Sequence, residues 1–355
     1  MKKIYLFGAL AIAAIAIGAC NDGQDNQKPQ GLVIEKQGVF SSGGRVTDPI
    51  PGDYDATQNW LDPERKGTTT HVDHANTFYQ IPAGEKGLPM VFLHGYGQTR
   101  TGWQATPDGR EGWSDIFLKK GHPVFLVDQP RRGAAGATEE IVNNPGDVAG
   151  TRFKVGEQAW YTHFRIGRVA PERYEGSQFP AGNEAQNQFF CQMTPNTGNY
   201  DEAVFSQALS AVLSDVKAMT GKKSIYVTHS QGGRVGWATD TDNMAAIVAV
   251  EPGFGPQIGS DTYKKFVEDK VPILFLFGDY IENGPEDIQS TAFWKNVMQQ
   301  CREFAEQYNA DGGNATVIHL PDVGITGNSH FMFQEMNNAQ IADLVAEWLE
   351  KHGLR

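Results

Sequence analysis

Residues 224–238 read Ser-Ile-Tyr-Val-Thr-His-Ser-Gln-Gly-Gly-Arg-Val-Gly-Trp-Ala, and this stretch decides the fold. It begins with a short apolar run, typical of a strand buried on both faces of a sheet, and ends with the apolar residues of a helix. Ser230 stands at the turn between them. A turn this tight needs small residues two positions on either side and strains the backbone of the serine, whose hydroxyl it exposes. We therefore predict that Ser230 is a nucleophile, although Thr228 replaces the usual first glycine; a serine that only caps the helix is the alternative.

Short apolar runs of the same kind recur along the chain, at residues 90–93, 123–127, 245–250, 271–277 and 315–320. Amphipathic helical patterns lie between several of them and at the C-terminus, where Ile341, Leu344, Val345, Trp348 and Leu349 follow helical spacing. Residues 32–46 and 68–81 alternate instead, which predicts two antiparallel strands. The pattern predicts an α/β fold with a mostly parallel, doubly wound sheet, helices on both faces and functional groups beyond the carboxyl ends of the strands.

One segment, residues 134–199, breaks this alternation because it is rich in Gly, Asn, Pro and aromatic residues and has no evident buried strand. Long connections in compact domains are usually functional, so we predict an inserted cap over the site. Its aromatic residues include Trp160, Tyr161, Phe164 and Phe179. A surface excursion with a small core of its own is the alternative.

Candidate partners for Ser230 follow other predicted strands. His330 lies in Gly327-Asn328-Ser329-His330-Phe331, between the last strand and the last helix, and is predicted to be the general base. The loop His94-Gly95-Tyr96-Gly97 follows the run at 90–93, so the backbone N–H groups of Tyr96 and Gln231 are predicted to form an oxyanion hole. Two carboxylates could orient His330, Glu251 and Asp279, and the residues themselves do not separate them.

The remaining histidines and cysteines carry weaker signals. His319 lies within an apolar run and is predicted to be packed in the core, whereas His71 and His74 fall on opposite faces of an alternating strand and predict no metal site. Cys191 and Cys301 could form a disulfide in an oxidising compartment or remain buried thiols, and the sequence leaves both readings open.

A set of ordered motifs carries a family resemblance: residues 89–99, 107–113, 127–130, 132–133, 229–232, 251–253, 278–279 and 327–330. Together they resemble the bacterial secreted esterase subgroup related to the Alcaligenes esterase, within the α/β-hydrolase superfamily. In that subgroup the triad acid is a glutamate after the strand that follows the nucleophile, so the resemblance implies Glu251. The cap segment matches the subgroup poorly, and substrate choice is therefore not implied.

These features predict a serine hydrolase that cleaves small-molecule carboxylic esters through an acyl-enzyme, with a Ser-His-Glu triad and without metal or organic cofactor. Peptidase, lipase and acyltransferase chemistry use the same triad. The rival from another class is a surface lipoprotein that binds a ligand without catalysis. The net charge of −12 argues against nucleic acid as a partner, and a homodimer is compatible with the sequence.

The N-terminus reads as an export signal. Lys2 and Lys3 precede an apolar run over residues 4–17 that is too short to span a membrane, and small residues lead to Cys20. The pattern resembles a bacterial lipobox. It predicts a signal peptide at 1–19, lipidation of Cys20, a tether at 20–30 and a hydrolase domain at 31–355, exported and anchored to the cell envelope (periplasm or cell surface) only through Cys20. An ordinary cleaved signal is the alternative.

Overall fold

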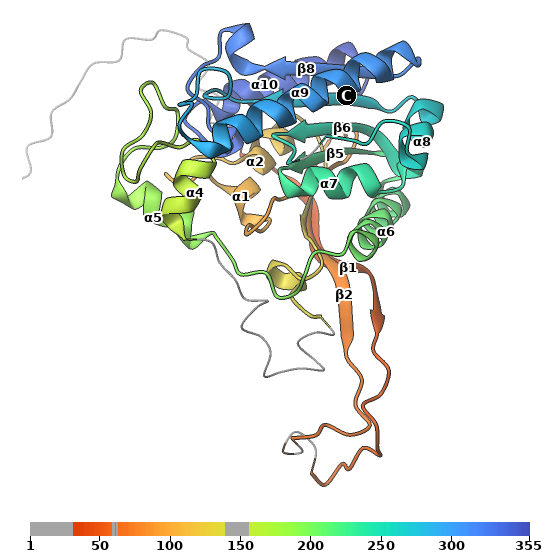
Figure 1. The fold of residues 1–355 in the computed structure, drawn as a ribbon. Helices are drawn as coiled ribbons and strands as arrows, with labels where there is room; N and C mark the ends of the chain where they lie inside the picture. Colours follow the sequence, from red (N-terminus) through yellow and green to blue (C-terminus); the bar gives the residue numbers. More distant parts are fainter. Residues whose placement is uncertain (1–30, 59–60, 62, 85, 139–155, 254) are drawn as a thin grey trace, which may run out of the picture. The chain divides into compact units, whose positions relative to one another are not determined.

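A computed structural model describes residues 31–58, 61, 63–84, 86–138, 156–253 and 255–355. Residues 33–355 belong to one compact unit. Within the described residues its centre is an eight-stranded sheet of order β1-β2-β4-β3-β5-β6-β7-β8 (Figure 1). The strands are β1 (Ile34–Val46), β2 (His71–Pro82), β3 (Met90–Leu93), β4 (Val124–Asp128), β5 (Ser224–His229), β6 (Met244–Val250), β7 (Pro272–Phe277) and β8 (Asn314–His319).

The sheet is mostly parallel. β1 pairs with β2, and β2 with β4, in antiparallel fashion, while all other neighbours are parallel. Strands β3, β4 and β5 are buried along their whole length, as their apolar sequences require in a sheet covered on both faces. The predicted fold class and the predicted antiparallel pair are therefore confirmed.

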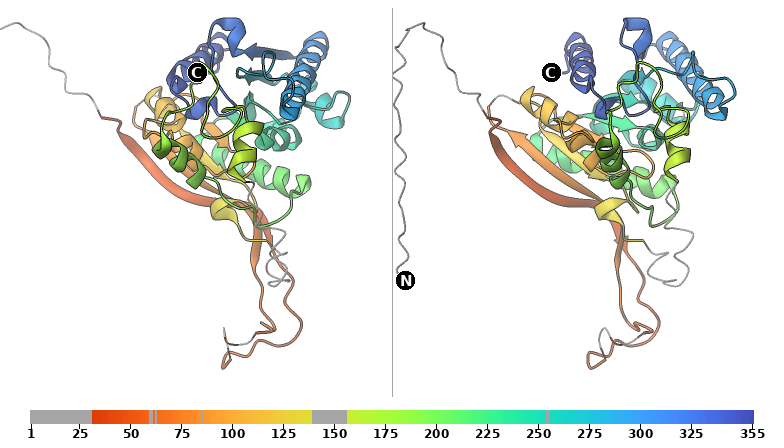
Figure 2. Two further views of the ribbon diagram at one scale, coloured as in Figure 1. Left: turned by 60° about the vertical axis from the view of Figure 1, so that its left-hand side comes forward. Right: turned by 90° about the vertical axis from the view of Figure 1, so that its left-hand side faces the viewer.

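Helices cover the sheet on both faces (Figure 2). They are α1 (Thr101–Gln104), α2 (Trp113–Lys119), α4 (Glu157–His163), α5 (Asn183–Cys191), α6 (Glu202–Thr220), α7 (Gln231–Ala238), α8 (Asp261–Asp269), α9 (Gln289–Ala310) and α10 (Asn338–Lys351). Short 3-10 turns are η2 (Gly133–Ala135), η3 (Thr241–Asn243), η4 (Leu320–Val323) and η5 (Met332–Gln334). Helix α2 packs against α10, and α6 packs against α7.

Helix α6 illustrates how local sequence sets these boundaries. The Asp201 carboxylate accepts from the backbone N–H groups of Ala203 and Val204, which caps the start of the helix, and Gly221 ends it with a left-handed φ of 74°. Between these ends, the apolar face predicted from the sequence is buried against the sheet. Capping determines where the helix begins and ends, and burial of its apolar face stabilises the turns between these two ends.

The hairpin formed by β1 and β2 extends beyond the part of β2 that pairs with β4. β2 pairs with β4 only over residues 76–80, whereas its pairing with β1 continues to His71 opposite Val46, and residues 47–70 connect the two strands (Figure 1). His71 and His74 lie on this hairpin. Among the described residues no group of three His, Cys, Asp or Glu side chains is arranged to hold a metal ion.

The segment 134–199 carries α4 and α5 and, in its described part, no strand. Residues 139–155 of this segment lie outside the described residues, as do the predicted signal peptide, Cys20 and tether. A search of the described helices finds none with the length and apolar character to cross a membrane. Cys191 and Cys301 are free thiols, the first exposed and the second buried, so the structure contains no disulfide between them.

Candidate active site

Ser230 occupies the turn between β5 and α7 in a strained conformation. Its φ of 53° and ψ of −121° lie in a region that L-residues rarely adopt, and such strain costs on the order of 1–3 kcal/mol. Three backbone hydrogen bonds hold it there: Ser230 N–H donates to the Val250 carbonyl (3.1 Å), and the N–H groups of Gly253 (3.0 Å) and Gly233 (2.9 Å) donate to the Ser230 carbonyl. The strand–turn–helix predicted from the sequence is therefore present.

The bulkier Thr228, which replaces the usual glycine, is accommodated by Gly236 on α7. A Cβ placed at Gly236 would lie 3.1 Å from Thr228 Cγ2, which is tighter than an ordinary van der Waals contact. Helix α7 thus provides the space that the threonine occupies. The sequence analysis did not use Gly236 to explain the threonine.

The loop His94–Gly97 lies directly against Ser230. A Cβ at Gly95 would be 2.8 Å from Ser230 Cβ, so only glycine fits at this position. The imidazole of His94 is buried, which lowers its pKa and keeps it neutral. Its Nδ1 contacts the Gly95 carbonyl (2.8 Å), and the backbone N–H of Gln129 donates to its Nε2 (3.4 Å). His94 therefore supports the loop that carries Tyr96.

The structure brings His330 to Glu251. Oε2 of Glu251 is 3.2 Å from His330 Nδ1, and both side chains are fully buried. Glu251 follows β6, has a positive φ of 47° and donates its backbone N–H to the Leu276 carbonyl (2.9 Å), which holds it at the end of the sheet. The carboxylate is thus placed to select the tautomer of the imidazole that has a proton on Nδ1.

Asp279, the other candidate acid, bonds to the backbone instead. Its two oxygens accept from the N–H groups of Tyr280 (2.7 Å) and Gly327 (2.8 Å), and its own N–H donates to the Asn328 carbonyl (2.7 Å). Asp279 therefore ties the loop that carries His330 to the end of β7, and within the described residues it has no hydrogen bond to the imidazole.

The ring of His330 is packed among aromatic side chains. Phe164 stacks on it with a centroid distance of 4.6 Å, and Trp294 of α9 lies 4.4 Å away. His229, which precedes Ser230, has its ring 4.5 Å from that of His330 and contacts the His330 carbonyl through Nε2 (3.0 Å). The fold therefore brings His330 into contact with the residue next to Ser230, although the two are 101 positions apart in the sequence.

Burial also sets the protonation of His330. It lowers the pKa of His330 well below the ordinary value, and the positive charge of Arg165 lowers it further, so the imidazole is neutral at neutral pH. Burial likewise lowers the pKa of His229 well below its ordinary value. His330 Nε2, on the side of the ring opposite Glu251, is buried and has no hydrogen-bond partner among the described residues. The bond from Ser230 Oγ to this nitrogen is thus not formed in this structure.

Sequence reasoning missed two residues of this neighbourhood. Arg165, from the segment after α4, donates to Glu251, and Glu335 anchors the loop before His330 by accepting from Ser329 N–H (2.9 Å) and Asn328 Nδ2 (2.7 Å). No motif marks either residue. Their only sequence signal is that each is a charged residue near aromatic side chains in a region that lacks a simple apolar period.

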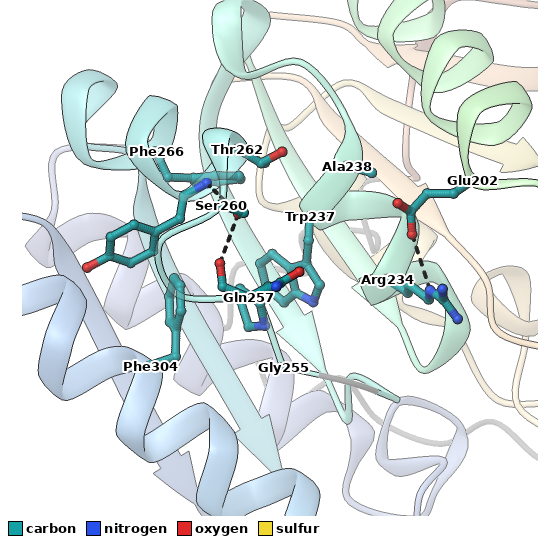
Figure 3. Close-up of a pocket in the computed structure, with 12 residues that line it drawn as sticks. Glu202, Arg234, Trp237, Ala238, Gly255, Gln257, Ser260, Thr262, Phe266 and Phe304 are labelled. Atoms are coloured by element: carbon teal, nitrogen blue, oxygen red, sulfur yellow. Dashed lines mark hydrogen bonds and ion pairs between the residues drawn. The ribbon is translucent and has the colours of Figure 1, made fainter.

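A separate cavity of about 530 Å³ lies beside α7 and α8 (Figure 3). Trp237 and Phe304 line it, and the Arg234–Glu202 ion pair (3.2 Å) lies at its edge. Ser230, Glu251 and His330 are not among its lining residues. The three candidate catalytic residues therefore lie outside the lining of this cavity.

Two comparisons with known proteins agree with this geometry. A solved structure described as a novel bacterial esterase matches with a TM-score of 0.76 and 31% identity, over 92% of this chain and 98% of its own. A curated protein named probable secreted lipase phiG, from Fungal sp. (strain ATCC 74256), is 26% identical over 314 residues, which cover 74% of this chain and 82% of that protein. No model of a protein family matches the chain. The chain belongs to the α/β-hydrolase superfamily, in the family of this bacterial esterase, and is a carboxylic ester hydrolase.

Proposed function

We propose that this hydrolase cleaves small-molecule esters through an acyl-enzyme formed on Ser230, with His330 as general base and Glu251 as the acid that orients it. The observation that carries the proposal is the His330–Glu251 hydrogen bond (3.2 Å) at the strand ends, beside a serine with the φ of 53° expected of a strained nucleophile. A neutral, buried imidazole with an open Nε2 is suited to accept the serine proton.

The reaction proceeds in two halves. Ser230 Oγ attacks the ester carbonyl carbon while His330 Nε2 takes the hydroxyl proton, and the negative charge on the carbonyl oxygen is stabilised by the backbone N–H groups of Tyr96 and Gln231. His330 then gives its proton to the leaving alcohol, which leaves the acyl group on Ser230. A water molecule gives a proton to the same nitrogen, attacks the acyl carbon and releases the acid as the proton returns to Ser230.

The two proposed oxyanion donors have suitable backbone positions. Gln231 is the first residue of α7, where a helix N–H has no partner within the helix and the helix dipole favours negative charge. Tyr96 follows Gly95, which packs against Ser230, so its backbone is close to the nucleophile. Removal of one such donor typically costs on the order of 100-fold or more in kcat.

A fluorophosphonate probe tests the nucleophile. We expect one label per molecule, mapped to Ser230 by peptide mass spectrometry, and we expect Ser230→Ala to lose both labelling and p-nitrophenyl acetate hydrolysis. Ser260→Ala is the matched control, since Ser260 caps α8 and lines the separate cavity, which Ser230 and His330 do not line. Hydrolysis by the Ser230→Ala variant at the wild-type rate would refute the proposal.

The acyl and alcohol preferences distinguish an esterase of short substrates from a lipase, the activity named for the curated relative. We propose the first, because the segment that faces His330 contains charged as well as aromatic residues, with Arg165 next to Phe164. A panel of p-nitrophenyl esters from acetate to palmitate tests this preference. Highest kcat/KM on the longest chains, with activation at an oil–water interface, would assign lipase activity instead.

We further propose that the protein is exported and anchored through a lipid on Cys20. The sequence pattern around this residue supports the proposal, and the curated relative is named as a secreted protein. Intact-mass measurement of the membrane fraction should show a diacylglyceryl-modified N-terminus at Cys20. Cys20→Ser should then shift the activity from the membrane to the soluble fraction. An unmodified mature wild-type chain in the soluble fraction would contradict anchoring.

A further inference from the structure

The segment His163–Arg165, at the C-terminal end of α4, contacts the proposed base and acid through hydrogen bonds. His330 N–H donates to the Phe164 carbonyl (3.1 Å), Arg165 Nη2 donates to Glu251 Oε1 (2.6 Å), and Arg165 Nε donates to the Asp279 carbonyl (3.0 Å). Trp294 Nε1 donates to the His163 carbonyl (2.9 Å), which fixes the segment against α9. This segment thus reaches from the predicted cap into the catalytic neighbourhood.

We propose that Arg165 is a positioning residue for ester hydrolysis: it fixes the Glu251 carboxylate against His330 and opposes premature protonation of the base. The inference rests on the proposed function of Ser230, His330 and Glu251. Arg165 touches neither Ser230 nor, in the proposed mechanism, the ester, so it acts through Glu251.

The hydrogen bonds of Glu251 divide its two oxygens between two tasks. Oε1 accepts from Arg165 Nη2 (2.6 Å) and from Gly278 N–H (2.5 Å), whereas Oε2 faces His330 Nδ1 (3.2 Å). A carboxylate held at one oxygen by two donors cannot rotate about its terminal bond without losing both. Arg165 and Gly278 therefore set the plane in which Oε2 meets the imidazole.

Arg165 is itself held in place. Its side chain is 2% exposed, its guanidinium lies over the ring of Trp294 (5.1 Å to the centroid), and its φ is 62°. A planar guanidinium can donate to Glu251 and to the Asp279 carbonyl at the same time, which a lysine ammonium cannot match in geometry. The site is thus built for an arginine rather than for any cation.

The charges around His330 explain why Arg165 opposes its protonation. When His330 is neutral, the positive charge of Arg165 and the negative charge of Glu251 cancel. Protonation of the buried imidazole therefore leaves the site with a net positive charge. The ionisable side chains around His330 are Glu251 after β6, Arg165 and His163 at the end of α4, and His229 after β5; Asp279 and Glu335 anchor its loop. Loss of the Arg165 charge would leave the Glu251 carboxylate uncompensated, and it would then attract a proton to His330.

The test compares Arg165→Met and Arg165→Lys with Arg168→Met. Arg168 lies three residues further on, is 52% exposed and pairs with Asp287 at the surface, so this variant removes the same charge without touching Glu251. For each protein, p-nitrophenyl acetate hydrolysis is measured from pH 4.5 to 9, with fluorophosphonate labelling of Ser230 and thermal unfolding recorded in parallel.

We expect Arg165→Met to shift the acidic limb of the pH profile of kcat/KM to higher pH by about one unit, because His330 is protonated more readily in this variant. Its kcat at the plateau should fall by about tenfold or more as Glu251 loses its anchor. Arg165→Lys should keep the acidic limb close to that of the wild type but show a lower kcat with little change in KM. Arg168→Met should match the wild type in both respects.

The outcomes separate the two proposals. If the wild-type enzyme is not labelled at Ser230, the proposed function fails. If it is labelled, but Arg165→Met is folded and keeps the wild-type pH profile, the role of Arg165 is refuted. Should Arg165→Met not fold, Arg165→Lys decides alone, and a wild-type kcat in that variant would overturn the positioning role.

Discussion

Glu335 allows a stability prediction, because it is a carboxyl group buried completely below the loop of His330. Its oxygens accept from Ser329 N–H and Asn328 Nδ2, yet burial has the larger effect and raises its pKa to about 7 from the usual 4.5. The perturbation is Glu335→Gln, which keeps the shape of the side chain and removes its titration. Glu347→Gln on the exposed side of α10 is the matched control.

The sign and size of the effect follow from proton linkage. Because the pKa is higher in the folded state, the folded protein holds this proton more tightly than the unfolded chain. The associated stability is complete below about pH 4.5 and is lost as the pH rises through about 7. Between pH 5 and 8, a shift of this size changes the free energy of unfolding by roughly 2–3 kcal/mol.

Urea unfolding, followed by tryptophan fluorescence at pH 5 and pH 8, measures this difference. All other titrating groups are shared, so subtracting the variant from the wild type isolates Glu335. We expect the wild type to lose about 2–3 kcal/mol more than Glu335→Gln over this pH interval, and Glu347→Gln to behave like the wild type. Equal pH dependence in the wild type and Glu335→Gln would refute the reasoning, whatever the absolute stability of the variant.

Three further predictions concern the site and the cysteines. Glu251→Gln should lower kcat by about 100-fold or more, because the glutamine amide no longer stabilises the charged imidazole. Asp279→Asn should lower kcat much less, since asparagine keeps one acceptor for the backbone N–H groups. A larger loss of kcat in Asp279→Asn would assign the acid to Asp279. Gly95→Ala should abolish ester hydrolysis in a folded protein, since its methyl group would lie 2.8 Å from Ser230 Cβ. Gly156→Ala should not, because an added Cβ there would meet Gln158 Oε1 only at 4.0 Å among the described residues. Equal rates in the two variants would disprove the close contact. Iodoacetamide should label the exposed Cys191 but not Cys301, which is buried and has a raised thiol pKa; a peptide that links the two cysteines would contradict the free thiols.

The sequence predicted the sheet because its signals are local. Runs such as Met90–Leu93 and Pro272–Phe277 are apolar throughout, and a strand covered on both faces has no other way to remain buried. Helix α9 was not located, although Trp294, Val297, Cys301, Phe304 and Tyr308 follow helical spacing and are buried. Polar residues between them, including paired glutamines, masked a period that a count over the full 22 residues would have detected.

The choice between Glu251 and Asp279 as the acid cannot be made from local sequence patterns. Both follow strands of the parallel sheet and both are carboxylates, so they differ only in what lies opposite each one in space. In the structure, the backbone N–H groups of Tyr280 and Gly327 occupy the oxygens of Asp279, whereas Glu251 keeps one oxygen for His330. The resemblance to the esterase subgroup pointed to Glu251 without this reason.

The position of Arg165 places a constraint on the segment 134–199 that the sequence does not show. A segment that only selected substrates would be free to vary, but this segment, which is predicted to be a cap, also supplies the guanidinium that donates to Glu251 and the Phe164 carbonyl that accepts from His330 N–H. Changes that shift the end of α4 would therefore alter the rate of catalysis as well as substrate choice. It follows that substitutions at Trp160, whose ring contacts Phe164 at 4.5 Å, should change kcat together with KM, whereas changes on α5 at exposed Glu184 should affect neither.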